Sequence, residues 1–214
     1  MALAVLLYAF GGKMFTSDAT SPTAPPVPSA TKQAPAAAPQ PARPHASASS
    51  GTGATSMSSP VMPRSAPIRL RIPKIRVDAP FTGLKIGPSG ALDPPPADDT
   101  NLVGWQSSGI SPGQRGTAII AGHLDTKTSA AVFARLSELS PGDSFEVDRA
   151  DGTTAVFLID SVENFDKDDF PDQRVYEDTP DALVRLITCA GAYNRTAHDY
   201  TENLVVFAHL DAAA

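Results

Sequence analysis

Residues 183 to 189 read Leu183-Val184-Arg185-Leu186-Ile187-Thr188-Cys189, a β-type run that ends in the only cysteine of the 214-residue chain. Ala190-Gly191 and a polar stretch follow at once, so Cys189 lies where a predicted strand gives way to a loop. A lone cysteine cannot form an internal disulfide, and it is therefore either a small buried filler or a reactive thiol. Its place at the mouth of a strand favours a thiol that meets a substrate.

Further short runs predict a mainly β domain around this strand. Alternating or continuous apolar residues predict strands at 68–72, 117–121, 144–147, 154–162 and 204–209. Asp151-Gly152 is a hairpin signal between two of them, and Ala130 to Leu139 has the apolar spacing of one short helix. Many short strands with a single helix predict a small closed or nearly closed β-barrel.

Composition divides the chain into three parts. No Phe, Tyr or Trp occurs between Thr16 and Pro80, and residues 20–67 hold 11 of the 21 prolines. Such a segment lacks the apolar surface that offsets the entropy of ordering, so residues 16–67 are predicted to be a disordered Pro/Ala/Ser-rich tether. The folded domain is predicted to be residues 68–214.

The first fifteen residues begin with an apolar run that is too short for a full membrane span, which needs about 20 residues. The run also lacks the basic flank that opens a signal peptide. A truncated membrane anchor that starts upstream of Met1 is preferred over an imperfect signal sequence or a chance apolar terminus. An apolar start before a long tether is the layout of an extracytoplasmic enzyme that is anchored to a membrane.

The charge of the folded part excludes several partners. From Ile68 onward there are 13 Lys and Arg against 22 Asp and Glu, a net charge of −9. An acidic domain is a poor candidate for nucleic acid or for anionic membrane surfaces. Four aspartates cluster at 166, 168, 169 and 172, but they lack the spacing of an EF-hand. A solvated acidic loop is the preferred interpretation, and no metal or cofactor is predicted.

A cysteine is a good nucleophile only as a thiolate, which a neighbouring imidazolium stabilises. His123 is the preferred partner because it ends a buried strand just after a glycine. His198, in the loop after Cys189, is the second candidate. His45 lies in the predicted tether, and His209 closes the last strand, where a surface position is expected.

An acyl-transfer site also needs a donor for the developing oxyanion. Arg195, six residues after Cys189, could fold back over the thiol. Arg185 points to the same strand face as Cys189, but about 13 Å away, and it is expected to be a solvated barrel residue.

These motifs together resemble the sortases, the cell-wall transpeptidases of Gram-positive bacteria. The resemblance runs from about Ile68 to Leu210 and is carried by 121–123 (Ala-Gly-His), 186–189 (Leu-Ile-Thr-Cys) and 204–208 (Leu-Val-Val-Phe-Ala). Residues 71–75, 103–105 and the Pro-Gly turn at 112–113 add to it. A glycine soon after the cysteine and a last strand led by Asn203 are most similar to the class F sortases of actinobacteria.

The resemblance implies an eight-stranded barrel with one or two short helices and a Cys-His-Arg site. It implies cleavage of a Leu-Pro-x-Thr-Gly sorting signal on surface proteins, through a thioacyl-enzyme that a peptidoglycan-precursor amine resolves. It further implies a monomer held at the membrane by its N-terminus.

Cys189 and His123 correspond directly to the family's site, but the arginine does not. The position that carries it in better-known sortases appears here as Asn203, so either Arg195 reaches in or Asn203 and backbone amides bind the oxyanion. Thr188 and Gly191, beside the nucleophile, are predicted with Asn203 to bind substrate or the oxyanion.

Two other functions compete with a sortase. An L,D-type cysteine transpeptidase is disfavoured, because residues 185–192 contain no His-Gly-Cys cluster. A sortase-like domain that binds wall peptides without turnover is the main alternative, supported by the missing strand arginine.

Overall fold

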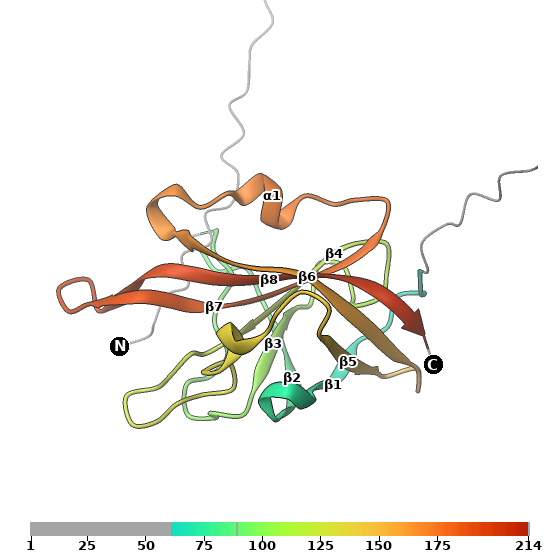
Figure 1. The fold of residues 1–214 in the computed structure, drawn as a ribbon, viewed down its shortest axis with the longest axis horizontal. Helices are drawn as coiled ribbons and strands as arrows, with labels where there is room; N and C mark the ends of the chain where they lie inside the picture. Colours follow the sequence, from blue (N-terminus) through green and yellow to red (C-terminus); the bar gives the residue numbers. More distant parts are fainter. Residues whose placement is uncertain (1–60, 89, 214) are drawn as a thin grey trace, which may run out of the picture. The chain divides into compact units, whose positions relative to one another are not determined.

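The computed structural model of the protein describes residues 61–88 and 90–213. Eight strands close into a barrel in the order β1-β2-β3-β4-β7-β8-β6-β5, with β5 returning to β1 (Figure 1). The strands are β1 (Pro67–Ile72), β2 (Val77–Leu84), β3 (Val103–Gln106), β4 (Gly116–Gly122), β5 (Ser144–Arg149), β6 (Thr154–Asp166), β7 (Ala182–Asn194) and β8 (Asp199–Ala213). The predicted mainly β, eight-stranded fold is confirmed.

The predicted membrane segment, residues 1–15, lies outside the described residues, as does the predicted tether up to residue 60. Within the described part of the chain, no helix has the length and apolar character that crossing a membrane requires.

Residues just before β1 already pack onto the barrel. Met62 is buried, and its backbone N–H donates to the carbonyl of Gly113 at 2.7 Å. The guanidinium of Arg64 lies over the ring of Trp105, 5.4 Å from the centroid. Ordered packing therefore begins several residues before Ile68, where the sequence placed the start of the domain.

Two neighbouring strand pairs are parallel, β2–β3 and β4–β7, and the others are antiparallel. Parallel neighbours need a long crossover connection. Between β4 and β7 this crossover contains β5, β6 and α1 (Asp172–Tyr176), so β4 and β7 lie side by side although they are far apart in the sequence.

Helical structure is scarcer and differently placed than the sequence predicted. The described residues form three 3-10 turns, η1 (Pro73–Ile75), η2 (Leu136–Glu138) and η3 (Lys167–Asp169), and the five-residue α1. The helix predicted over 130–139 is wrong except for η2, because the backbone N–H groups there donate to the carbonyl three residues back. The apolar spacing still buries Phe133 and Leu136.

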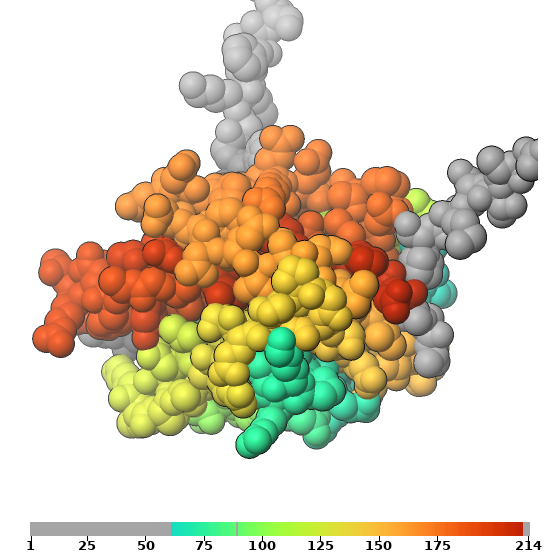
Figure 2. Space-filling view, in the orientation of Figure 1, coloured from blue at the N-terminus to red at the C-terminus, as the bar shows by residue number. Residues whose placement is uncertain are grey.

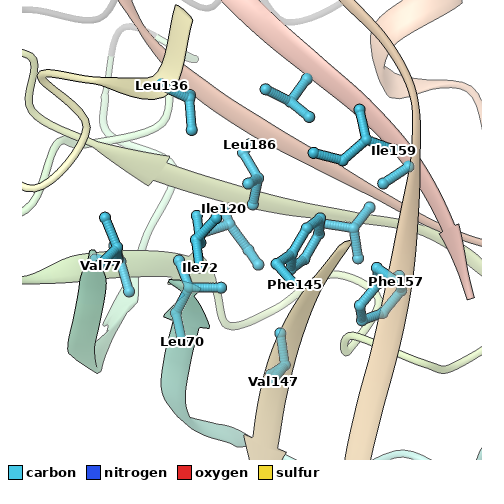
Figure 3. Close-up of a cluster of buried hydrophobic side chains, with 14 of the residues drawn as sticks. Leu70, Ile72, Val77, Ile120, Leu136, Phe145, Val147, Phe157, Ile159 and Leu186 are labelled. Carbon is cyan, nitrogen blue, oxygen red and sulfur yellow. The ribbon is translucent and has the colours of Figure 1, made fainter. Parts of the chain in front are cut away.

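Side chains alternate between two apolar layers because successive residues of a strand point to opposite faces. The inner layer fills the barrel with residues such as Leu70, Ile120, Phe145 and Leu186 (Figure 3). The outer layer contains Ile119, Ala121, Ile187, Cys189, Val205 and Phe207, from β4, β7 and β8. The β6–β7 connection covers this outer layer through Val175 of α1 and neighbouring aromatic residues. Figure 2 shows this connection in orange along the upper part of the molecule.

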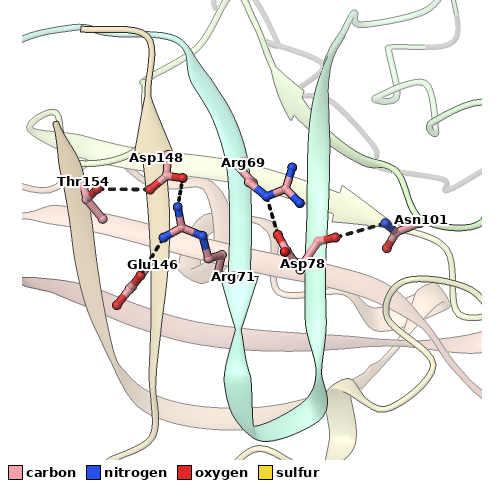
Figure 4. Close-up of polar contacts among 7 residues, drawn as sticks. All are labelled: Arg69, Arg71, Asp78, Asn101, Glu146, Asp148 and Thr154. Atoms are coloured by element: carbon pink, nitrogen blue, oxygen red, sulfur yellow. Dashed lines mark hydrogen bonds and ion pairs between the residues drawn. The ribbon is translucent and has the colours of Figure 1, made fainter. Parts of the chain in front are cut away.

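The arginines of β1 are neutralised by carboxylates of the two adjacent strands (Figure 4). Arg69 contacts Asp78 of β2 at 2.5 Å, and Arg71 contacts Glu146 and Asp148 of β5. Most of these side chains are 41–56% exposed, so each pair contributes little stability, roughly 0–1 kcal/mol. This face of the barrel lies opposite in strand order to the β4–β7–β8 face that carries Cys189.

Candidate active site

Cys189 lies on β7 with its side chain on the outer face of the barrel, and only 3% of the residue is exposed. Burial is the main cause that raises the pKa of its thiol, and the nearby Asp199 and Asp125 carboxylates raise it further. Lys167 acts in the opposite sense and lowers the pKa. A thiolate at this position therefore depends on a cation or an imidazolium beside it.

The parallel register of β4 and β7 brings His123 to Cys189. The pairs run from Gly116↔Ala182 to Ala121↔Ile187, so His123 and Cys189 each follow the last pair by two residues. The two side chains share the outer face, because each lies two residues beyond a paired residue of that face. His123 is 6% exposed. The register thus leads the two residues that the sequence selected, 66 positions apart, to the same end of two neighbouring strands.

A proline carbonyl orients the His123 ring. Nε2 lies 2.8 Å from the carbonyl oxygen of Pro95, in the connection between β2 and β3. A carbonyl oxygen only accepts, so Nε2 carries the proton and Nδ1 holds the free lone pair of the neutral ring. Pro95, in the triple-proline segment, therefore leaves Nδ1 as the proton acceptor.

The other histidines lie away from the thiol. His198 is exposed in the turn between β7 and β8, with a φ of 55°. His209 is paired with Asp160 at 2.6 Å, twenty residues beyond Cys189 on β8. His45 is outside the described residues. Among the described histidines, His123 is the one that follows the β4–β7 pairing by the same two residues as Cys189.

Asn203 faces Cys189 directly across the β7–β8 pairing. Its side chain is fully buried, and neither Oδ1 nor Nδ2 has a hydrogen-bond partner among the described residues. An unpartnered buried amide typically costs about 1–3 kcal/mol. The Asn203 amide is thus a donor and an acceptor held next to the thiol.

Thr188 and Gly191 have different positions from those expected of contact residues. Thr188 pairs with Leu204 on the inner face, so its side chain points away from Cys189. Gly191 has a φ of 76°, and a Cβ there would lie 2.7 Å from the hydroxyl of Thr201. Gly191 therefore shapes the irregular pairing beyond Cys189 and lets β8 approach closely.

Arg195 lies in the exposed turn that follows β7. This turn is at the end of the β7–β8 hairpin, which extends to one side of the barrel (Figure 1). Six residues of strand span up to about 20 Å. The structure does not bring the guanidinium of Arg195 to Cys189, and its predicted role stays a prediction.

Lys167, which the sequence interpretation passed over, lies in contact with the thiol. Its Nζ is 3.8 Å from Sγ of Cys189 and 2.7 Å from both carboxylate oxygens of Asp199. Its side chain is 9% exposed. Lys167 begins η3 within the acidic run 166–169. A single lysine among these aspartates is the feature of the sequence that could have pointed to it. Among the described residues, no group of three or more His, Cys, Asp or Glu could hold a metal ion.

The segment after His123 is tied to β8. The hydroxyl of Tyr200 donates to Asp125 at 2.5 Å, and the bond to this carboxylate raises the pKa of Tyr200 to about 12. The ring of Tyr200 packs edge-on against Tyr193 of β7, with ring centroids 5.2 Å apart. These contacts join β7, β8 and the segment after β4 around the thiol.

A cavity of about 720 Å³ lies along the outer face of β4. Thr117 and Ile119 form part of its floor, and they share a face with His123 because all three are an even number of residues apart. Its walls come from the β2–β3 and β3–β4 connections and from α1. Binding sites for small ligands typically measure 300–1,000 Å³, so a short peptide segment would fit in this cavity. Neither Cys189 nor His123 lines it, and its nearest lining residue on β4, Ile119, precedes His123 by four residues.

A sortase-domain family model matches residues 70–211, about two thirds of the chain. The chain belongs to the sortase family.

Solved sortase structures have the same fold. A sortase C-1 from Actinomyces oris is 22% identical, with a TM-score of 0.52 over 67% of this chain and 73% of that one. Sortase C from Streptococcus pneumoniae is 17% identical, with a TM-score of 0.52 over 71% and 69%. Sortase A from Corynebacterium diphtheriae is 19% identical, with a TM-score of 0.53 over 70% and 62%. Comparison with curated protein sequences gave no match.

Within this sortase, Arg185 corrects one expectation from the sequence. It is buried rather than solvated, with its guanidinium 4.6 Å from the centroid of the Phe207 ring. Burial lowers its pKa to about 10. The cover provided by the β6–β7 connection explains the difference, because that cover is absent from any local sequence pattern.

Proposed function

We propose that this sortase is a cysteine transpeptidase that cleaves a sorting signal through a thioacyl-enzyme and transfers the cleaved protein to an amine. The observation that carries the proposal is the parallel β4–β7 register, whose last pair, Ala121↔Ile187, precedes His123 and Cys189 by two residues each. The cavity on the outer face of β4 supports it, because it offers room for a peptide on the sheet face that leads toward His123.

Two acyl transfers make up the reaction. The Cys189 thiolate attacks the carbonyl carbon of the scissile peptide bond, a C–S bond forms, and the C–N bond breaks as His123 gives its proton to the leaving amine. The acceptor amine then attacks the thioester and loses a proton to His123. The new amide forms, and the thiolate is regenerated. Pro95 holds the ring in one tautomer, so Nδ1 is the nitrogen placed to exchange these protons.

The finer features of the function rest on the sequence resemblance. The signal is of the Leu-Pro-x-Thr-Gly type, cut between Thr and Gly, and the acceptor is an amine on a peptidoglycan precursor. The enzyme is a monomer of class F type that works outside the membrane. Residues 1–15 belong to an anchor, and the predicted tether, which ends before Met62 packs onto the barrel, joins the two.

A sortase-like domain that binds wall peptides without turnover is the alternative. Burial of Cys189, which raises the pKa of its thiol, and the exposed position of Arg195 favour this alternative. The two functions differ in one product, the thioester on Cys189.

The deciding experiment incubates the full chain with a Leu-Pro-x-Thr-Gly peptide and an amine, and follows cleavage, ligation and the Cys189 thioester by mass spectrometry. We expect a thioester in the wild type and no turnover in Cys189→Ala or His123→Ala, since the two residues act as a unit. His209→Ala is the matched control and should retain activity, because His209 pairs with Asp160 elsewhere on β8. If no thioester forms with any of a set of signal peptides, the transpeptidase proposal is refuted.

A further inference from the structure

We propose that Lys167 is the cationic catalytic residue of this site, in contact with the Cys189 sulfur and placed to stabilise the oxyanion of each acyl transfer. The inference rests on the proposed transpeptidase function and names a residue of that same site. It assigns to the β6–β7 connection a role that the sequence resemblance gave to an arginine.

Three elements meet at the Lys167 ammonium group. Lys167 begins η3 directly after β6, Cys189 lies on β7, and Asp199 is the first residue of β8. Nζ donates to both oxygens of Asp199 at 2.7 Å and to Sγ at 3.8 Å. An ammonium group has three N–H donors, so this geometry uses two for the carboxylate and directs the third to sulfur.

Low exposure makes this contact effective. The side chain of Lys167 is 9% exposed and that of Asp199 is 18% exposed, so solvent screens the charges weakly. Asp199 fixes the position of the ammonium group. The long lysine side chain is thereby held in one geometry before substrate arrives, which is the condition for electrostatic stabilisation of a transition state.

The charged groups around the thiol single out Lys167. Asp199 and Asp125 raise the pKa of Cys189, whereas Lys167 lowers it by its charge and by its hydrogen bond. Arg195 is exposed in the hairpin turn. The guanidinium of Arg185 is held against Phe207.

The reaction needs a cation that stabilises negative charge first on sulfur and then on the carbonyl oxygen. Before attack the charge is on sulfur, and as the C–S bond forms it moves to the carbonyl oxygen. Lys167 donates a hydrogen bond to the thiolate first and to the neighbouring oxyanion next, and no proton leaves Nζ in either step. The unpartnered amide of Asn203, across from Cys189, can supply a second, neutral donor to the same oxygen.

The test uses the full chain with Lys167→Met, Lys167→Arg and Arg195→Ala, and with Lys85→Met as an exposed-lysine control. The chain has a single cysteine, so a ¹³C label at the cysteine Cβ gives one resonance whose pH titration reports the thiolate without any substrate. Cleavage of a Leu-Pro-x-Thr-Gly peptide supplies kcat/KM.

We expect Lys167→Met to move the Cys189 titration to higher pH and to lower kcat/KM on the order of a hundredfold, with partial recovery in Lys167→Arg. Lys85→Met should leave both quantities at wild-type values, and Arg195→Ala should leave the Cys189 titration at its wild-type pH. An unchanged titration or an unchanged kcat/KM in Lys167→Met would overturn the proposal, as would a loss of kcat/KM in Arg195→Ala with none in Lys167→Met.

Two further outcomes are separated by design. If the wild type cleaves no peptide, the transpeptidase function fails, and the substrate-free titration still decides whether Lys167 acts on the thiol. If Lys167→Met does not fold, Lys167→Gln makes the same test, because it removes the charge that lowers the Cys189 pKa and keeps a polar side chain at this position. A Cys189 titration at the wild-type pH in Lys167→Gln would then overturn the proposal.

Discussion

Replacing Asn203 by leucine should stabilise the protein while impairing catalysis. Leucine has nearly the shape of asparagine, and Asn203 is fully buried with both polar atoms of its amide unpartnered. Removing an unpartnered buried amide should raise the free energy of unfolding by about 1–3 kcal/mol. For a domain of this size, that gain corresponds to an increase in Tm of roughly 2 to 12 °C.

The assay pairs thermal unfolding, followed by circular dichroism, with peptide cleavage by the same preparation. Asn164→Leu is the matched control, because the Asn164 amide is exposed and donates to Glu202 at 2.9 Å. This control should lower the unfolding free energy slightly and leave cleavage unchanged. For Asn203→Leu we expect a higher Tm and at least about tenfold slower cleavage, as for the loss of an oxyanion donor.

A lower Tm in Asn203→Leu would refute this reasoning. It would mean that the Asn203 amide makes stabilising hydrogen bonds, and that its burial next to Cys189 is a matter of folding. A higher Tm with unchanged cleavage would keep the energetic argument and remove Asn203 from the catalytic site.

Two more predictions test the surroundings of the site. Gly122→Ala should lower the free energy of unfolding by about 1–3 kcal/mol and slow cleavage. The reason is that a Cβ at this position would lie 2.5 Å from the Phe133 ring and displace the adjacent His123. Urea unfolding measures the first effect and kcat the second. Glu163→Gln should lose less stability between pH 7 and pH 3 than the wild type. Arg174 lowers the folded pKa of Glu163 below the ordinary 4.5, so the Glu163–Arg174 pair stabilises the protein above pH 4.5. This stabilisation is lost as the pH falls through the folded pKa. Equal pH dependence of urea unfolding in both proteins would contradict the second prediction.

The sequence predicted best what depends on local pattern. The apolar runs of β4 and β7 were recognisable, and so were the strand ends that carry His123 and Cys189. The alternation of side chains along a strand also predicts the direction of Thr188. Thr188 precedes Cys189 by one residue, so its side chain had to point to the opposite face.

Features set by distant parts of the chain were missed. Lys167 contacts a cysteine 22 residues away and an aspartate from a hairpin, while its local sequence is typical of a solvated acidic loop. Arg185 is buried by the packing of the β6–β7 connection, which no charge pattern predicts. The segment 130–139 has apolar spacing that fits both an α-helix and successive tight turns, and only the hydrogen bonds tell them apart.

The parallel register of β4 and β7 has a consequence for insertions and deletions. One residue added within β7 before Cys189, or within β4 before His123, would turn that side chain to the opposite face of the sheet. Residues added to the turn between β5 and β6 would leave both strands unchanged, so chain length there is free to vary. The spacing of the reactive pair is therefore set by residue positions within β4 and β7, and the length of the β5–β6 turn carries no such constraint.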